Sequence, residues 1–168
     1  VGCTGALVDR NIQVTKALAQ VLKAANVSFA SLGEAETCTG DPARRLGNEY
    51  LFQMLAQQNV ETLKNYNVRK ILTHCPHCFN TIKNEYPQFG GHYEVVHHTD
   101  FLLQLIQDGK LNPDAPIDEK ITYHDSCYIG RYNNVYDSPR EILKSIPGID
   151  LVEMKRNRTK SFCCGAGG

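Results

Sequence analysis

The sequence has no net charge, no long apolar run and no export signal. Lysine plus arginine and aspartate plus glutamate both number 18, so no overall field favours nucleic acid or an anionic membrane. No apolar run approaches the roughly 20 residues that a membrane-spanning helix needs, and no basic-then-apolar signal segment opens the chain. The first residue is Val1 rather than methionine, which indicates a fragment of a longer protein. A nucleic-acid partner is not expected.

What is present is the composition of a soluble globular protein, with 42% hydrophobic and 21% charged residues in a chain of 168. That length suits one ordinary domain or two small modules. The informative residues are the seven cysteines. Their odd number and the missing export signal argue against a disulfide framework. Inert buried thiols would explain one or two of them, but not a C-x-x-C at 75–78 and an adjacent pair at 163–164.

Helical and strand-like patterns alternate along the chain. Strands separated by helices predict parallel β-α-β units, and hence an α/β fold. Asp9 is the expected N-cap of the first helix, and Pro42 suits the first turn of the second. The expected helices are 9–25, 41–65, 79–86, 99–109 and 138–145, and the expected strands are 27–30, 68–73, 93–97, 120–124 and 149–154.

The pattern restarts after the loop NPDAPIDEK, which indicates an internal repeat. Cys3 and Cys38 are separated by 34 residues, and Cys127 and Cys163 by 35. Each interval is expected to contain a helix, a strand and a glycine-bearing turn. We therefore predict a first module over 1–112 and a second over 113–168. The second has no C-x-x-C, so we expect it to be incomplete.

The cysteines of the first module lie after predicted strands or on turns before helices. In a parallel sheet such positions fall at the carboxyl ends of the strands, where open α/β folds build their sites. Four thiolates in one place suit zinc or an iron–sulfur cluster. A zinc site usually takes two close C-x-x-C pairs, whereas only one pair is close here. The spacing favours an iron–sulfur cluster, with zinc and metal-free thiol chemistry as alternatives.

The adjacent cysteines Cys163 and Cys164 favour a polynuclear centre. Consecutive side chains diverge, so such a pair chelates a single tetrahedral ion poorly. It can place two sulfurs on two irons of one cluster, or let one sulfur bridge them. The alternative is a strained disulfide between the two neighbours. Gly165 is expected to adopt a positive φ, which lets the backbone approach the cluster closely.

Histidines stand beside both groups of cysteines. His74 and His77 flank the C-x-x-C, where they are candidates for a hydrogen bond to cluster sulfur, for proton transfer or for capping the next helix. His124 precedes Cys127 at the end of a predicted strand. If that site binds a substrate disulfide, His124 is the natural proton donor, because imidazole titrates near neutrality. Otherwise it makes a structural hydrogen bond.

These motifs resemble a known family. The order Cys, gap, CCG, gap, C-x-x-C is similar to the cysteine-rich "CCG" domain of heterodisulfide reductase subunits, and of related iron–sulfur subunits of glycolate and lactate oxidation. The stretches CTGDPARRLGNEYLFQMLAQ, CPHCFNTIKNEYPQFGG and TYHDSCYIGRYN look most like one bacterial branch. That branch comprises membrane-associated oxidoreductases that pass electrons from electron-transfer flavoprotein to menaquinone. The resemblance covers essentially the whole chain.

The resemblance implies two tandem Rossmann-like modules with mainly parallel sheets and [4Fe-4S] clusters. In the catalytic subunit of heterodisulfide reductase, each complete motif binds a noncubane cluster. This sequence departs from the motif at Thr39, which stands where the second cysteine of CCG belongs. A cubane cluster is therefore expected at the first site, and a noncubane one at the second once it is completed. The implied ligands are Cys3, Cys38, Cys75, Cys78, Cys127, Cys163 and Cys164.

The resemblance also implies a function. The chain would be the iron–sulfur electron-transfer part of a larger oxidoreductase, on the cytoplasmic face of the cell membrane. Electrons would come from electron-transfer flavoprotein or another flavoprotein. They would leave through the rest of the polypeptide, or a membrane quinone-reducing subunit, to the quinone pool. The alternatives are a heterodisulfide or thiol–disulfide reductase module using His124, a subunit of glycolate or lactate oxidation, and a structural zinc module.

Overall fold

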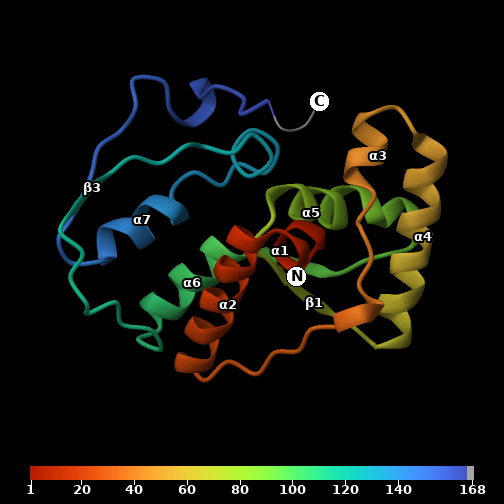
Figure 1. The fold of residues 1–168 in the computed structure, drawn as a ribbon, viewed down its shortest axis with the longest axis horizontal. Helices are drawn as coiled ribbons and strands as arrows, with labels where there is room; N and C mark the ends of the chain where they lie inside the picture. The colour runs from red at the N-terminus through yellow and green to blue at the C-terminus, as the bar shows by residue number, and fades with distance from the viewer. Residues whose placement is uncertain (166–168) are drawn as a thin grey trace. The chain divides into compact units, whose positions relative to one another are not determined.

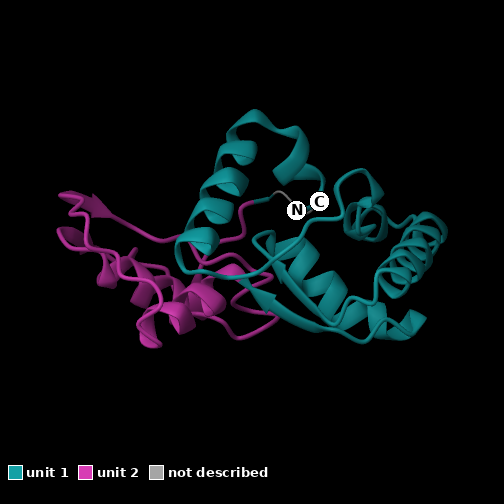
Figure 2. Cartoon of the chain, turned by 90° about the horizontal axis from the view of Figure 1, so that it is seen from below, with its two compact units in different colours: residues 1–97, 165–168 teal, residues 98–164 magenta. Residues whose placement is uncertain are grey.

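The computed structural model describes residues 1–165, so the last residues of the tail CCGAGG, 166–168, lie outside the described residues. The chain forms two compact units, residues 1–97 and residues 98–164 (Figure 2). Each unit contains one pair of parallel strands connected through a helix. The predicted α/β class with parallel sheets is confirmed. The predicted module boundary near residue 112 stays a prediction.

The first unit carries most of the helices (Figure 1). Its helical and strand elements, in chain order, are α1 (Cys3–Leu7), α2 (Asp9–Ala24), η1 (Gly33–Ala35), α3 (Asp41–Arg45), α4 (Glu49–Asn65), β1 (Lys70–Thr73), α5 (Pro76–Asn80), η2 (Thr81–Glu85), η3 (Tyr86–Phe89) and β2 (Glu94–His97).

The core of the first unit lies between α4 and the crossover that joins β1 to β2. The two strands pair in parallel, with Ile71 opposite Val95, and the crossover runs through α5, η2 and η3. Phe52 and Ala56 of α4 and Tyr86 of η3 are fully buried in this layer. An apolar stripe on α4 packed against the crossover thus fixes the end of β1, where the C-x-x-C begins.

The two long helices end in the same way. Asn26 after α2 and Asn67 after α4 both adopt a left-handed conformation, with φ of 54° and 52°. In each case the next amide turns back onto the last helical turn, Val27 onto Leu22 and Val68 onto Leu63. Asparagine tolerates this conformation, which stops a helix sharply. Asp9, the predicted N-cap of α2, instead lies inside the first turn, and Val8 occupies the cap position.

The single helix predicted over 41–65 is wrong, because the chain breaks it into α3 and α4. Gly47 adopts φ of 84°, which no helix interior allows. Asn48 then caps α4, since its side-chain oxygen accepts a hydrogen bond from the Leu51 amide at 3.1 Å. A Gly-Asn pair is a combined stop and start signal, and it outweighs the apolar periodicity on either side of it.

The strand predicted over 27–30 is also wrong. This segment is irregular, and Phe29 within it is 44% exposed. No strand of the described residues, 1–165, pairs with it, and a strand without a hydrogen-bonded partner does not persist in water. The interval 3–38 therefore contains a helix and a glycine turn but lacks the strand that we expected it to share with the interval 127–163.

The second unit is a smaller β-α-β arrangement. Its elements are α6 (His98–Gln107), β3 (Glu119–Ile121), α7 (Ser138–Ser145), β4 (Ile149–Leu151) and η4 (Arg158–Lys160). The strands β3 and β4 pair in parallel, and α6 packs against α7. Leu105, Tyr128 and Ile129 are its most buried apolar side chains. Long loops follow β3 and β4, and these loops carry the second group of cysteines.

Candidate functional site

Four cysteines of the first unit meet where three segments converge beside α5. Cys75 follows β1 and occupies the N-cap of α5, and Cys78 is buried inside that helix. The segment that opens α1 passes close by, because a Cβ added at Gly2 would lie 3.3 Å from the sulfur of Cys78. The carboxyl end of β1 thus carries Cys75 and Cys78, as expected for an α/β fold, whereas Cys3 opens α1 and Cys38 lies on a turn that no strand of the described residues precedes.

The two thiols of the C-x-x-C differ in acidity. A hydrogen bond from Cys78, together with the backbone amides of Cys78 and His77, lowers the pKa of Cys75 to about 6. The same bond to Cys75, with burial and the negative charge of Cys75, raises the pKa of Cys78. Cys75 is therefore the thiolate of the pair at neutral pH, and thiolates are the form that binds metal.

Cys3 and Cys38 form the other pair. Burial raises the pKa of Cys38, the hydrogen bond and charge of Cys3 add to that effect, and the Gly40 amide, 3.5 Å from the Cys38 sulfur, opposes it. Cys3 also interacts electrostatically with Cys78, which links the two pairs. The structure thus brings together the four cysteines that the sequence singled out. Within residues 1–165, no three His, Cys, Asp or Glu side chains are grouped so as to hold a single metal ion.

The turn that carries Cys38 is held by side chains of the scaffold. The amide of Asn59 on α4 donates to the Cys38 carbonyl at 2.9 Å, and the hydroxyl of Tyr86 donates to the Thr39 carbonyl at 3.1 Å. Gly40 has φ of 87°, and a Cβ there would lie 2.9 Å from a buried aromatic ring of α4. Only glycine fits this position.

A buried carboxylate network lies beside the C-x-x-C. Asp41, 1% exposed, accepts hydrogen bonds from His77 at 2.6 Å, Thr81 at 3.2 Å and Arg45 at 3.1 Å. Burial alone would raise the pKa of Asp41, but His77 and Arg45 hold it below its usual value. The bond to Asp41 in turn raises the pKa of His77. Sequence reasoning missed Asp41, for which the only signal was its place before Pro42.

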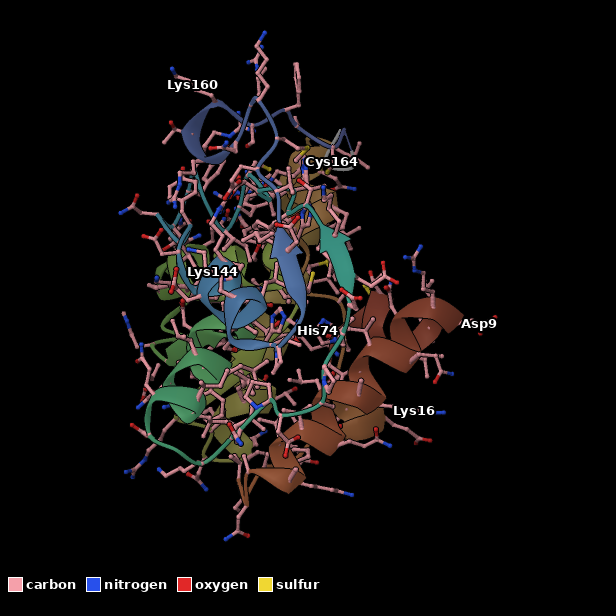
Figure 3. The ribbon with its side chains drawn as sticks, turned by 90° about the vertical axis from the view of Figure 1, so that its left-hand side faces the viewer. Asp9, Lys16, His74, Lys144, Lys160 and Cys164 are labelled. Atoms are coloured by element: carbon pink, nitrogen blue, oxygen red, sulfur yellow. The ribbon has the colours of Figure 1, made fainter. Side chains whose placement is uncertain are left out.

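His74 is engaged with the neighbouring helix. Its Nε2 lies 3.0 Å from the hydroxyl of Thr15 on α2, and burial lowers its pKa (Figure 3 labels His74). Gly5 leaves room for the ring, since a Cβ there would lie 2.9 Å from it. These contacts tie α1 and α2 to the end of β1, so His74 has a structural part in bringing the segment of Cys3 to the C-x-x-C.

The second group of cysteines lies on the loops that follow β3 and β4. Burial raises the pKa of Cys127, and the charges of Cys163 and Cys164 add to the effect, so the three thiols are near one another. Cys163 and Cys164 are exposed (Figure 3 labels Cys164). Gly165 has φ of 78°, which confirms the positive φ predicted for it.

A buried ion network joins these two loops. Asp125, 2% exposed, accepts bidentate hydrogen bonds at 2.7 and 2.8 Å from Arg140, which is 1% exposed. Arg140 also donates to Glu153 at 2.5 and 3.0 Å. Asp125 further accepts the backbone amide of Arg158 at 2.6 Å, and the Ser161 hydroxyl donates to the Asp125 carbonyl at 3.2 Å. The loop of Cys127 is thereby tied to the loop of Cys163.

The network holds its members in their charged forms. Burial alone would raise the pKa of Asp125, but the bonds from Arg140 and the Arg158 amide hold it below the usual value. Hydrogen bonds to Asp125 and Glu153 raise the pKa of Arg140. His124, next to Asp125 in the sequence, is exposed to solvent. Its catalytic role stays a prediction.

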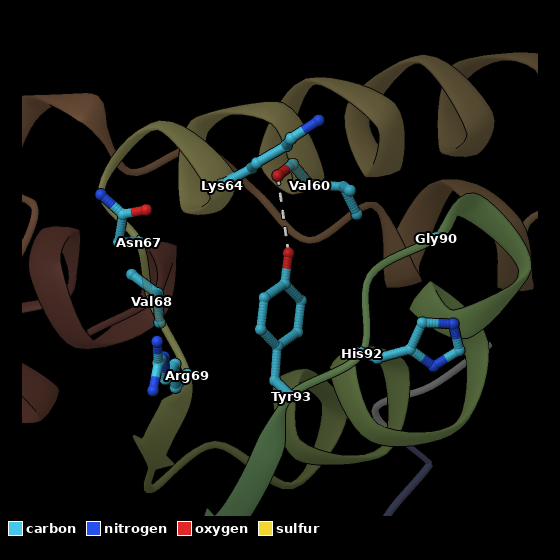
Figure 4. A pocket seen from close by; sticks show the side chains of 8 residues that line it. All are labelled: Val60, Lys64, Asn67, Val68, Arg69, Gly90, His92 and Tyr93. Atoms are coloured by element: carbon cyan, nitrogen blue, oxygen red, sulfur yellow. Dashed lines mark hydrogen bonds between the residues drawn. The ribbon is translucent and has the colours of Figure 1, made fainter.

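A hollow of about 270 Å³ lies at the other end of the first sheet (Figure 4). It is lined by residues that precede β1 and β2, among them Arg69 and Tyr93, and by Val60 and Lys64 of α4. The Tyr93 hydroxyl donates to the Val60 carbonyl at 3.5 Å across it. Because it lies at the amino ends of the strands and contains no cysteine, this hollow is separate from the thiol site.

The chain belongs to the CCG family of cysteine-rich domains. The family described as "Cysteine-rich domain" matches residues 1–83 and 121–168, and the two stretches contain the two thiol groups described above. The resemblance seen in the cysteine motifs is confirmed. Among residues 1–165, no helix has both the length and the apolar character that crossing a bilayer requires.

Several curated proteins are similar over the whole chain. It is 54% identical over 168 residues to "Probable iron-sulfur-binding oxidoreductase FadF" of Bacillus subtilis (strain 168), covering 100% of this chain and 24% of that protein. It is 52% identical over 167 residues to "EtfAB:quinone oxidoreductase" of Syntrophomonas wolfei, covering 99% and 23%. The chain thus spans about a quarter of the length of these relatives.

A more distant relative comes from an archaeon. The chain is 39% identical over 173 residues to one subunit of the dihydromethanophenazine:CoB--CoM heterodisulfide reductase of Methanosarcina barkeri, covering 99% of this chain and 42% of that relative. No solved structure matches the chain.

Proposed function

We propose that Cys3, Cys38, Cys75 and Cys78 hold one [4Fe-4S] cluster, and that this chain transfers electrons as part of a larger oxidoreductase. The observation that carries the proposal is the meeting of four thiols from three segments. Backbone amides already point at the sulfurs of Cys38 and Cys75, which is how proteins stabilise thiolate ligands. Thiol donors of this number fit an iron–sulfur cluster.

A bound cluster supplies one-electron transfer, and the polypeptide sets its potential through thiolates, hydrogen bonds and burial. Four thiols and a threonine in place of a fifth cysteine favour a cubane at this site. The second group offers only Cys127, Cys163 and Cys164. We propose that a further ligand from outside residues 1–168 joins them, and that the completed cluster is noncubane, in a second module over 113–168.

The names of two relatives support an electron route for the proposal. One is named an EtfAB:quinone oxidoreductase and another a membrane-anchored ferredoxin. We therefore propose that this chain receives electrons from an electron-transfer flavoprotein and passes them towards a membrane quinone. It would do so on the cytoplasmic face, together with other parts of the enzyme.

Anaerobic reconstitution of the purified chain with ferrous iron and sulfide tests the proposal. We expect bound iron and acid-labile sulfide in equal amounts, together with the electron paramagnetic resonance (EPR) signal of a reduced cubane cluster. A chain that binds zinc stoichiometrically and contains no acid-labile sulfide would be a structural zinc module, and the electron-transfer proposal would be wrong.

A second candidate function is the reduction of a disulfide substrate at the second site. The observation in its favour is that Cys163, Cys164 and His124 are all exposed. On this hypothesis, the enzyme containing this chain reduces a thiol heterodisulfide, and His124→Asn lowers that rate at least tenfold by removing a proton donor. Equal rates in the two proteins would contradict the role of His124, and no turnover in either would exclude the function.

A further inference from the structure

We propose that the Thr39 hydroxyl donates a hydrogen bond to the Cys78 ligand and raises the reduction potential of the first cluster. Thr39 stands where the family motif has a metal-binding cysteine, so the sequence alone presents it as a lost ligand. The structure assigns it a different task. The inference rests on the proposed function, because it requires Cys78 to bind the cluster.

The contact is direct and buried. The Thr39 Oγ1 lies 3.8 Å from the Cys78 Sγ, within the range of a hydroxyl-to-sulfur hydrogen bond, and the geometry makes the hydroxyl the donor. Thr39 is 8% exposed and Cys78 is 9% exposed. Since little water reaches either group, the bond acts in a low-dielectric environment, where it is electrostatically stronger than in water.

The donor is placed by the scaffold rather than by the metal. The carbonyl of Thr39 accepts the hydroxyl of the buried Tyr86, and the preceding carbonyl, that of Cys38, accepts the amide of Asn59. Gly40, on the other side, is locked by its positive φ and by the aromatic ring against it. The backbone on both sides of Thr39 is therefore fixed, and this orients its side chain towards Cys78.

Such a bond has a defined effect on the cluster. Adding an electron increases the negative charge on the ligand sulfurs, and a hydrogen-bond donor stabilises that charge. The reduced state gains more than the oxidised state, so the potential rises. A cysteine at position 39 would bring a fifth sulfur to the same place, whereas threonine brings a proton donor. With threonine in place of cysteine, this position no longer binds the metal and instead raises the reduction potential of the cluster.

The test compares Thr39→Val with Thr39→Ser in the full chain, each carrying Cys127→Ala so that only the first site is observed. Valine keeps the shape of threonine and removes the donor, while serine keeps the donor. Redox titration followed by EPR gives the midpoint potential of each variant. Electron–nuclear double resonance in heavy water gives the exchangeable protons coupled to the reduced cluster.

We expect the midpoint potential of Thr39→Val to move to more negative values and one exchangeable proton coupling to disappear, while Thr39→Ser resembles the parent. Equal potentials and proton couplings in all three proteins would overturn the inference and leave the proposed function intact. Absence of iron and sulfide from the parent itself would overturn the proposed function, and this inference with it. If Thr39→Val assembles no cluster, Thr39→Ala replaces it, because alanine also removes the donor. The same negative shift of the midpoint potential is then expected for Thr39→Ala.

Discussion

Replacing Arg140 with methionine is expected to destabilise the second unit by about 3–5 kcal/mol, a large part of the stability of so small a structure. Arg140 is buried between Asp125 and Glu153, which receive hydrogen bonds from all its nitrogens. Methionine fills much of the same volume but leaves Asp125 as a buried carboxylate without its cation. The cost arises from that uncompensated charge rather than from lost packing.

Hydrogen–deuterium exchange of peptides from β3, α7 and β4 measures this effect without interference from the first unit. The matched control is Lys144→Met, which removes a cation from the same helix but breaks only the exposed pair with Glu141 at 3.0 Å. We expect that control to change stability by at most about 0.5 kcal/mol. Equal protection in Arg140→Met and Lys144→Met would show that the buried network does not support this unit.

Replacing Cys75 with alanine is expected to abolish iron and sulfide binding at the first site. Cys75 is the thiol with a pKa of about 6, so it is mostly ionised at neutral pH, the form that binds metal. The remaining thiols then come from α1, a turn and a buried position, and the site has lost the thiolate of the C-x-x-C.

Iron and acid-labile sulfide per chain measure this loss after anaerobic reconstitution. Cys127→Ala is the matched control, because it removes a thiol of the second group and leaves the first group complete. We expect the control to keep the cubane EPR signal and Cys75→Ala to lose it. The assignment of ligands to the first site would be wrong if Cys75→Ala kept the signal, or if Cys127→Ala lost it.

The place of Cys75 and Cys78 was predictable because it depends on topology. A strand followed directly by C-x-x-C places Cys75 at the carboxyl end of a parallel strand, and periodicity was enough to identify β1 and β2. The sequence could not show how the thiols would differ in acidity. That difference depends on which backbone amides point at Cys75 and on how deeply Cys78 is buried, and both are set by tertiary packing.

The two wrongly predicted elements, the strand 27–30 and the continuous helix 41–65, have physical causes. Residues 27–30 have the β-branched and aromatic composition of a strand, but composition cannot tell whether a partner strand lies alongside. The helix over 41–65 was predicted as continuous because its apolar spacing continues on both sides of Gly47. The Gly-Asn pair that interrupts it was visible in the sequence, and giving it more weight than the periodicity would have placed the break correctly.

The residues that could not be found from the sequence are mostly polar groups that are remote from the cysteine loops in the sequence but hydrogen-bond to them in the fold. Arg140 lies in a helix, where a charged residue is usually exposed, and nothing in its sequence neighbourhood indicates burial. Asn59 and Tyr86 are far from Cys38 in the sequence, so only the folded chain shows that they hold its turn. Thr39 was recognised as a departure from the motif but not as a donor.

The bonds from Asn59 and Tyr86 to the turn of Cys38 have a consequence for how the protein matures. They join protein to protein, so they form when the first unit folds and do not wait for iron. The turn is therefore folded before any metal arrives, and iron binds to it without further folding of the chain. A chelator should strip iron from such a site and leave the helices in place, so that the same molecules accept iron again without being refolded.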